Sequence, residues 1–126
     1  MAVAAFLAGC FGADEEPRPA TGPPRAIAEV VQRLERATAE HDFETICRDL
    51  LTPAARRQAG GPDCVQLTRS AAADVERPSI ELVSIDLTGS SARAHVRTRA
   101  SGQALVSDVL VLRRVGGEWR VDSLGG

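Results

Sequence analysis

The chain of 126 residues contains no lysine, no asparagine and no tyrosine, and aromatic residues make up only 3% of it. The absence of lysine excludes Schiff-base chemistry on a lysine amine. With so few aromatic rings, a core must be built from aliphatic side chains, and a hydrophobic content of 44% is sufficient for one. The formal net charge of -2 argues against nucleic acid as a partner.

Long hydrophobic runs are also absent, and cysteine and histidine are scarce. No apolar run approaches the roughly 20 residues of a transmembrane helix, so none is expected. The three cysteines form no Cys-X-X-Cys redox motif, and neither of the two histidines stands at ligand spacing to them. We therefore expect no metal site and no cofactor.

The first ten residues indicate a targeting sequence rather than part of a folded domain. Small apolar residues lead into Leu7-Ala8-Gly9-Cys10, which resembles the lipobox of bacterial lipoproteins. In that family the peptide is cut before the cysteine, which is then acylated. The segment is short for a signal peptide and lacks a basic start, since its first arginine is Arg18, so an incidental cysteine is the alternative. The resemblance implies a cell-envelope protein, lipid-anchored through Cys10 in the outer leaflet of the plasma membrane, with the bilayer as partner.

Residues 11–23 differ in composition from what precedes and follows them. They are rich in proline and acidic side chains and carry little apolar surface, which predicts a disordered tether. Residues 24–126 then leave room for a single domain.

The carboxyl-terminal half predicts an antiparallel sheet. Its runs are dense in Val, Ile, Leu and Thr, and short Gly/Ser turns separate them. The predicted strands are Ser79–Thr88, Ser91–Arg99, Ala104–Val115 and Glu118–Leu124. The last two are joined at Gly116-Gly117, where either a two-residue turn or a longer bulged loop is compatible with the sequence. The first alternative places Trp119 and Val121 on the face of Leu110 and Leu112, and the second places them with Val109 and Val111.

Alternation in the second predicted strand separates an apolar face from a basic one. The apolar face holds Ala92, Ala94, Val96 and Thr98, and the other holds Arg93, His95, Arg97 and Arg99. A tight turn centred on Ser101-Gly102 would pair Thr98 with Leu105 and Ala94 with Val109. The same register sets His95 directly across from Asp108.

His95 and Asp108 are the candidate catalytic residues. A carboxylate across from an imidazole could orient it and raise its basicity, as a general base needs. The alternative is a surface ion pair on the outer face of the sheet. Two further residues are candidate ligand contacts. Arg97 could hold an anion, or could simply be solvated, and Trp119 could line a cavity mouth, or could belong to the core.

The residues before the sheet predict helices. Apolar residues repeat at helical spacing from Pro24 to about Glu40. Asp42 can cap a second helix, Thr52-Pro53 a short third one, and Asp63 a fourth. The expected buried positions of the fourth helix are Cys64, Leu67, Ala71 and Val75. In an oxidising compartment, with Cys10 acylated, Cys47 and Cys64 are expected to form a disulfide; two buried thiols are the alternative.

This order of helices followed by strands resembles the nuclear-transport-factor-2-like superfamily. The run from Glu40 to Cys47 is similar to its first helix junction, and the run from Val111 to Val121 is similar to its last hairpin. The resemblance implies an α+β domain in which a curved antiparallel sheet of three to four strands wraps a long helix into a cone. The ketosteroid-isomerase type of that superfamily uses a tyrosine, which this chain lacks, so no catalytic residue carries over.

Three functions follow as hypotheses. The first is a non-enzymatic, membrane-tethered domain that binds a small molecule or an envelope protein. The second is an isomerase or dehydratase that uses His95 and Asp108. The third is a homodimerisation module that uses the outer face of the sheet through Leu110 and Leu112.

Overall fold

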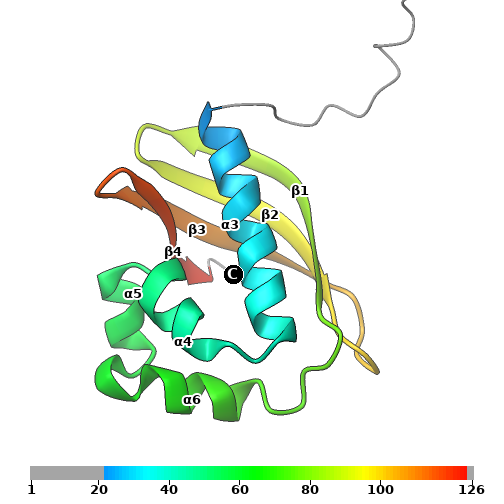
Figure 1. Ribbon diagram of the computed structural model, residues 1–126. Coiled ribbons are helices and arrows are strands. Elements are labelled where there is room, and N and C mark those ends of the chain that lie inside the picture. Colours follow the sequence, from blue (N-terminus) through cyan, green and yellow to red (C-terminus); the bar gives the residue numbers. More distant parts are fainter. Residues whose placement is uncertain (1–21, 125–126) are drawn as a thin grey trace, which may run out of the picture.

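The computed structural model describes residues 22–124, except for the side chain of Leu124. The predicted lipobox at Cys10 and most of the predicted tether therefore lie outside the described residues. Helix α3 (Gly22–Ala39) lies across a four-stranded antiparallel sheet that curves around it (Figure 1). The strands are β1 (Ser79–Thr88), β2 (Ser91–Arg99), β3 (Val106–Val115) and β4 (Glu118–Leu124), which neighbour one another in chain order. The predicted α+β class is confirmed.

Helix α3 packs its apolar stripe against the inner face of the sheet. Ile27, Val30 and Val31 are buried at helical spacing. They meet the small residues Ala92 and Ala94 of β2, which allow the helix to approach the sheet closely. Val96, Leu110, Leu112, Trp119 and Val121 complete this core.

The pairing of β2 with β3 differs from the predicted register by one residue. Ala94 lies opposite Leu110, and Val96 lies opposite Asp108. The predicted tight turn at Ser101-Gly102 forms, since the Gln103 N–H donates to the Ala100 carbonyl at 2.9 Å. It does not join the strands directly, because the connection continues to Leu105 before β3 begins, so Thr98 pairs with Val106 and not with Leu105. A shift by one residue exchanges the two faces of a strand. Leu110 and Leu112 are therefore core residues, 3% and 0% exposed, and cannot form the predicted outer-face dimer contact.

The last hairpin follows the first of the two alternatives. Val115 pairs with Glu118 across a two-residue turn, in which Gly116 and Gly117 have φ of 59° and 84°. A type of turn with positive φ at both positions suits the right-handed twist of the flanking strands. As a result, Trp119 and Val121 are buried on the same face as Leu112.

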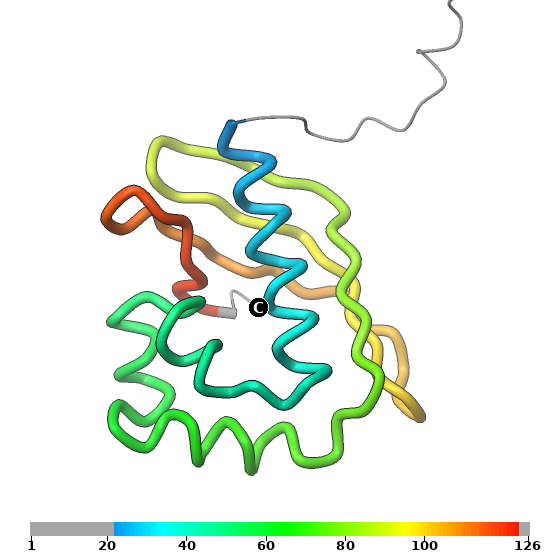
Figure 2. Tube along the Cα trace, in the orientation of Figure 1, coloured from blue at the N-terminus to red at the C-terminus, as the bar shows by residue number. Residues whose placement is uncertain are grey.

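Short helices gather at one end of the sheet (Figure 2). Helix α4 (Phe43–Thr45) begins at the predicted cap, where Asp42 Oδ1 accepts from the Thr45 N–H at 3.2 Å. It continues into a π-helical turn, η1 (Ile46–Leu50), which the sequence did not predict. Helix α5 (Pro53–Gln58) also has its predicted cap, since Thr52 Oγ1 accepts from the Ala55 N–H at 3.0 Å.

Helix α6 (Cys64–Ala71) departs from the prediction in two respects. The Asp63 side chain makes no capping hydrogen bond. The 3-10 turn η2 (Gly61–Asp63) precedes the helix, and the Gly61 carbonyl already accepts from the Cys64 N–H. Leu67 is 53% exposed, and Ala71 is exposed as well, so the expected buried stripe is limited to Cys64.

The predicted disulfide between Cys47 and Cys64 is confirmed. The Cα atoms of the two residues lie 6.2 Å apart, and both side chains are almost fully buried. The bond joins η1 to the first residue of α6, a helix that buries little else. It therefore supplies a restraint that apolar packing of α6 does not.

A polar cluster ties β4 to the helical end. The Thr52 hydroxyl donates to Asp122 Oδ1 at 2.7 Å, and Arg113 Nε donates to Asp122 Oδ2 at 3.1 Å. The Thr52 N–H donates to the carbonyl of Val121 at 2.9 Å. The Thr52 hydroxyl, and after it the Arg113 guanidinium, lower the pKa of Asp122 against an opposing effect of desolvation.

We expect loss of the disulfide to lower the free energy of unfolding by about 3 kcal/mol, because the bond closes a loop with a sequence separation of 17. The measurement is chemical denaturation of the chain carrying Cys10→Ser, with and without reductant. A chain that also carries Cys47→Ala and Cys64→Ala is the control and should not respond to reductant. Equal stability of the oxidised and reduced chains would contradict the prediction.

The lowered pKa of Asp122 makes a prediction about acid stability. A carboxylate with a lowered folded-state pKa stabilises the fold above its unfolded pKa of about 3.9, and the contribution is lost as the pH falls through the lower folded value. Asp122→Asn should therefore cost about 1 kcal/mol near neutral pH, a figure discounted for partial exposure.

The difference between Asp122→Asn and the parent should shrink as the pH falls below about 4. Denaturation midpoints across a pH series measure it. Asp74→Asn, at an exposed position, is the matched control. A difference for Asp122→Asn that stays constant with pH would refute the assignment.

Candidate functional site

A cavity of about 380 Å³ lies between the carboxyl-terminal half of α3 and the inner faces of β1, β2 and β3. This volume falls within the range of about 300 to 1,000 Å³ that small-molecule sites occupy. Most of its lining is apolar. The main apolar contributors are Leu34, Val75, Ile80, Val96, Val106 and Leu110.

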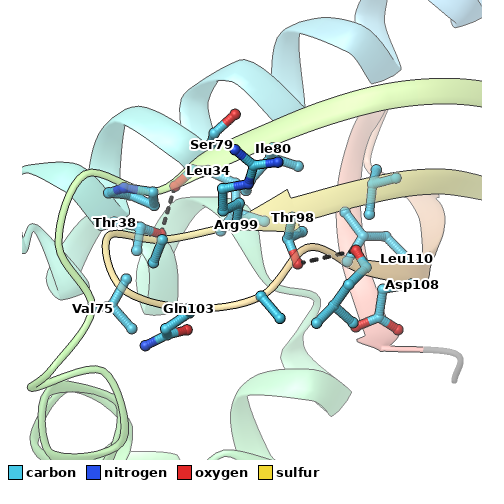
Figure 3. Close-up of a pocket in the computed structure, with 15 residues that line it drawn as sticks. Leu34, Thr38, Val75, Ser79, Ile80, Thr98, Arg99, Gln103, Asp108 and Leu110 are labelled. Carbon is cyan, nitrogen blue, oxygen red and sulfur yellow. Dashed lines mark hydrogen bonds between the residues drawn. The ribbon is translucent and has the colours of Figure 1, made fainter.

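The cavity owes its walls to two loops as well as to the sheet. The connection from Ala100 to Leu105 forms one wall, and the segment before β1 forms another (Figure 3). Two hydrogen bonds join them: the Ser101 N–H donates to the Glu76 carbonyl at 2.8 Å, and Arg77 Nη2 donates to Ser101 Oγ at 2.7 Å. Glu35 of α3 accepts from the Ile80 N–H at 2.7 Å, which fixes the edge of β1 to the helix.

Three partly buried polar side chains interrupt the apolar lining: Thr38 of α3, Thr98 of β2 and Asp108 of β3. Thr38 Oγ1 donates to the Leu34 carbonyl at 2.7 Å. Thr98 Oγ1 lies 3.5 Å from the Val106 carbonyl, to which it donates. Asp108 Oδ1 accepts from the N–H of Val109 at 3.0 Å. Figure 3 shows Asp108 and Leu110 at one end of the cavity, and Val75 and Gln103 at the other.

Comparison with known proteins identifies the architecture. No protein-family model matches the sequence, and no curated protein matches it. Solved structures do match. A protein of unknown function from Shewanella baltica, described as NTF2-like, is 24% identical over 79% of this chain and 87% of its own, with a TM-score of 0.59. A second one, from Silicibacter pomeroyi, is 19% identical over 79% of this chain and 89% of its own, with a TM-score of 0.60.

A variant of the protein Rd1NTF2_05 matches with a TM-score of 0.65, at 15% identity over 78% of this chain and 93% of its own. The chain has an NTF2-like fold. This confirms the architecture expected from the order of elements. At these identities the likeness extends to the fold alone.

Within this NTF2-like fold, the predicted pairing of His95 with Asp108 is wrong. His95 lies opposite Val109 and points to the outer face of the sheet, where its Nε2 is 3.0 Å from Asp86 Oδ2 of β1. Asp108 lies opposite Val96, whose side chain is buried on the inner face. The one-residue shift in register thus separates the two side chains, and no catalytic dyad forms from them.

His95 does take part in a surface ion pair, but with a different carboxylate than expected. Its side chain is 40% exposed, and that of Asp86 is 70% exposed. Interactions between such exposed groups contribute little to stability. The pair is best understood as part of the solvated outer face of the NTF2-like sheet.

The two candidate ligand contacts also lie away from the cavity. Arg97 is exposed on the outer face, opposite Glu81 and Ser107. Trp119 is 6% exposed and packs in the core with Val121, as one of the two interpretations had it. Neither residue lines the cavity.

Sequence reasoning missed the cavity because its walls come from segments far apart in the chain. One signal pointed to it, namely a carboxylate at Asp108 within an otherwise apolar strand. Among the described residues, no cluster of three His, Cys, Asp or Glu side chains could hold a metal ion. The helices of residues 22–124 include none that is both long and apolar enough to span a bilayer.

Proposed function

We propose that this protein binds a small, predominantly apolar molecule in the cavity between α3 and the sheet, without chemically altering it. The cavity carries the proposal, because it is of ligand size, has a mostly apolar lining and contains a few polar groups that could orient a guest. Its walls are tied by the bonds of Ser101, Arg77 and Glu35, so the site is largely formed before a ligand arrives.

Binding without turnover is favoured by the separation of the predicted dyad. An enzymatic role depended on His95 and Asp108 acting together, and the sheet holds them on opposite faces. Binding of an envelope protein is less well supported than binding of a small molecule, since the cavity is a concave site of limited volume.

We also propose that the domain is held at a membrane through acylated Cys10, in the outer leaflet of the plasma membrane. The motif Leu7-Ala8-Gly9-Cys10 supports this. The geometry of α3 is compatible with it, because the described chain begins at the amino end of α3, whereas the cavity lies beside Leu34 and Thr38 near the carboxyl end. An anchor attached at the amino end would leave the cavity accessible.

The cavity proposal is tested with Ala104→Trp, which places a large ring in the wall of the cavity at an exposed loop position. We expect native mass spectrometry of the exported chain carrying Cys10→Ser to show a bound small molecule that denaturation removes. Ala104→Trp should remove most of the bound fraction. Ala54→Trp, on an exposed face of α5 away from the cavity, is the matched control and should retain it.

Two results would refute ligand binding in the cavity. One is a bound fraction that is unchanged in Ala104→Trp. The other is a chain that carries no ligand and takes up no apolar dye in a manner sensitive to Ala104→Trp.

The anchor proposal is tested by fractionation of bacteria that express the chain. The parent should sediment with membranes and gain the mass of acyl chains, and Cys10→Ser should shift it to the soluble fraction. Ser70→Ala, at an exposed position that leaves Cys10 and the disulfide in place, is the control and should still sediment. An unmodified parent chain in the soluble fraction would refute the anchor and leave the cavity proposal intact.

A further inference from the structure

The partly buried polar groups of the cavity offer a ligand more hydrogen-bond acceptors than donors. A hydroxyl group has a single proton to donate. Thr38 donates its proton to the Leu34 carbonyl at 2.7 Å, so its oxygen can offer a ligand only lone pairs. Thr98 lies 3.5 Å from the Val106 carbonyl, which is long for a hydroxyl hydrogen bond, so its hydroxyl could either donate to a ligand or accept from it.

Asp108 makes this bias stronger. Its carboxylate has two oxygens and about four acceptor positions. One oxygen accepts from the N–H of Val109, the next residue along the strand. Among the described residues, the other oxygen has neither a hydrogen-bond donor nor an ion-pair partner. The inner face of β3 thus presents an acceptor, beside Leu110 and opposite Val96, that a ligand could satisfy.

Groups that could donate to a ligand lie at the rim of the cavity. Ser79, Arg99 and Gln103 belong to the lining but are exposed to solvent. Arg99 also follows His95 and Arg97 at every second position of β2, so its Cα–Cβ bond points to the outer face of the sheet. Thr38 and Asp108 are therefore acceptors within the cavity, and the charged and amide donors of its lining are exposed to solvent.

We propose that the ligand of this cavity is a small apolar amine, with its ammonium group against the Asp108 carboxylate and its apolar body against Val96, Leu110 and Leu34. This rests on the proposed function and specifies the class of ligand. An ammonium group supplies several donors and the charge that complements the carboxylate. A carboxylate ligand of the same size would be repelled by Asp108.

The test compares three probes that share one apolar body: phenylbutylamine, phenylbutanol and phenylbutyrate. Affinities are measured by isothermal titration calorimetry on the full chain carrying Cys10→Ser. We expect the amine to bind most tightly, the alcohol less tightly and the carboxylate least. The amine should exceed the carboxylate by about tenfold or more, as expected for a charge-assisted hydrogen bond.

Substitutions at Asp108 then locate the preference. Asp108→Asn should weaken amine binding by about tenfold and change alcohol binding by less than about threefold. Asp108→Glu keeps the carboxylate and should retain the preference for the amine. Asp86→Asn removes a carboxylate from the outer face and is the matched control, with no expected effect on any probe. Thermal denaturation checks that each variant folds.

The outcomes separate the two proposals. Equal affinities for all three probes, or an amine preference that survives Asp108→Asn, would overturn the amine assignment and leave the cavity as a binding site. Tightest binding of the carboxylate would overturn it as well and would direct attention to Arg99. The amine assignment is also overturned if the amine does not bind although the chain carries a molecule that Ala104→Trp removes. If no probe binds and Ala104→Trp does not change the bound fraction, the proposal that the cavity binds a ligand is itself refuted.

Discussion

The pairing of β2 with β3 determines which side chains face α3, and the rest of the structure depends on it. In the observed register, Ala92 and Ala94 lie opposite Leu112 and Leu110, so the inner face is apolar where the helix crosses it. The same register continues to Val96 and Asp108, beyond the densest part of the core. Because side chains alternate along β3, the carboxylate of Asp108 lies on the same apolar face as Leu110 and Leu112.

The short helices are fixed to the sheet by polar and apolar contacts. The polar cluster of Thr52 and Asp122 joins β4 to them, and Arg120 Nη1 donates to the Arg48 carbonyl at 3.0 Å. Phe43 and Leu50 form a second apolar cluster that Ala37 of α3 joins. The cavity lies against the same carboxyl-terminal half of α3, where Leu34 packs against this cluster and also lines the cavity. The cavity is thus supported by a packed core on one side, as a binding site on a rigid support requires.

Much of the fold was predictable because its signals are local. The Gly116-Gly117 turn, the caps at Asp42 and Thr52, and the pairing of the two remaining cysteines each follow from the chemistry of neighbouring residues or from counting. Three of the four strands were predicted with their observed bounds, and β3 begins at Val106 instead of Ala104. The exposure of Leu67 and Ala71 on α6 was not predictable from the apolar spacing of this helix. The disulfide at Cys64, rather than a buried apolar stripe, attaches α6 to the rest of the domain.

The candidate site was not predictable because it depends on a register that the sequence leaves ambiguous. Strand β3 is apolar on both faces, from Val109 to Leu112, so hydrophobicity alone does not decide between the two registers. The predicted turn at Ser101-Gly102 does form, but the connection between this turn and β3 is one residue longer than in a tight hairpin, so Val106 and not Leu105 lies opposite Thr98. Asp108 stands out in the sequence as a carboxylate between Val106 and Leu110, but the predicted register places it on the face of His95, whereas the structure places it opposite Val96.

The measurement that tests this account most directly is the register of β2 against β3 by nuclear Overhauser effects between backbone protons in solution. The account predicts cross-strand contacts that link Val96 with Asp108 and Ala94 with Leu110. Such contacts would establish that Asp108 faces the cavity and that His95 faces solvent. Contacts that link His95 with Asp108 and Ala94 with Val109 would contradict it, because they would turn Asp108 to the outer face and restore the pair that the present structure separates.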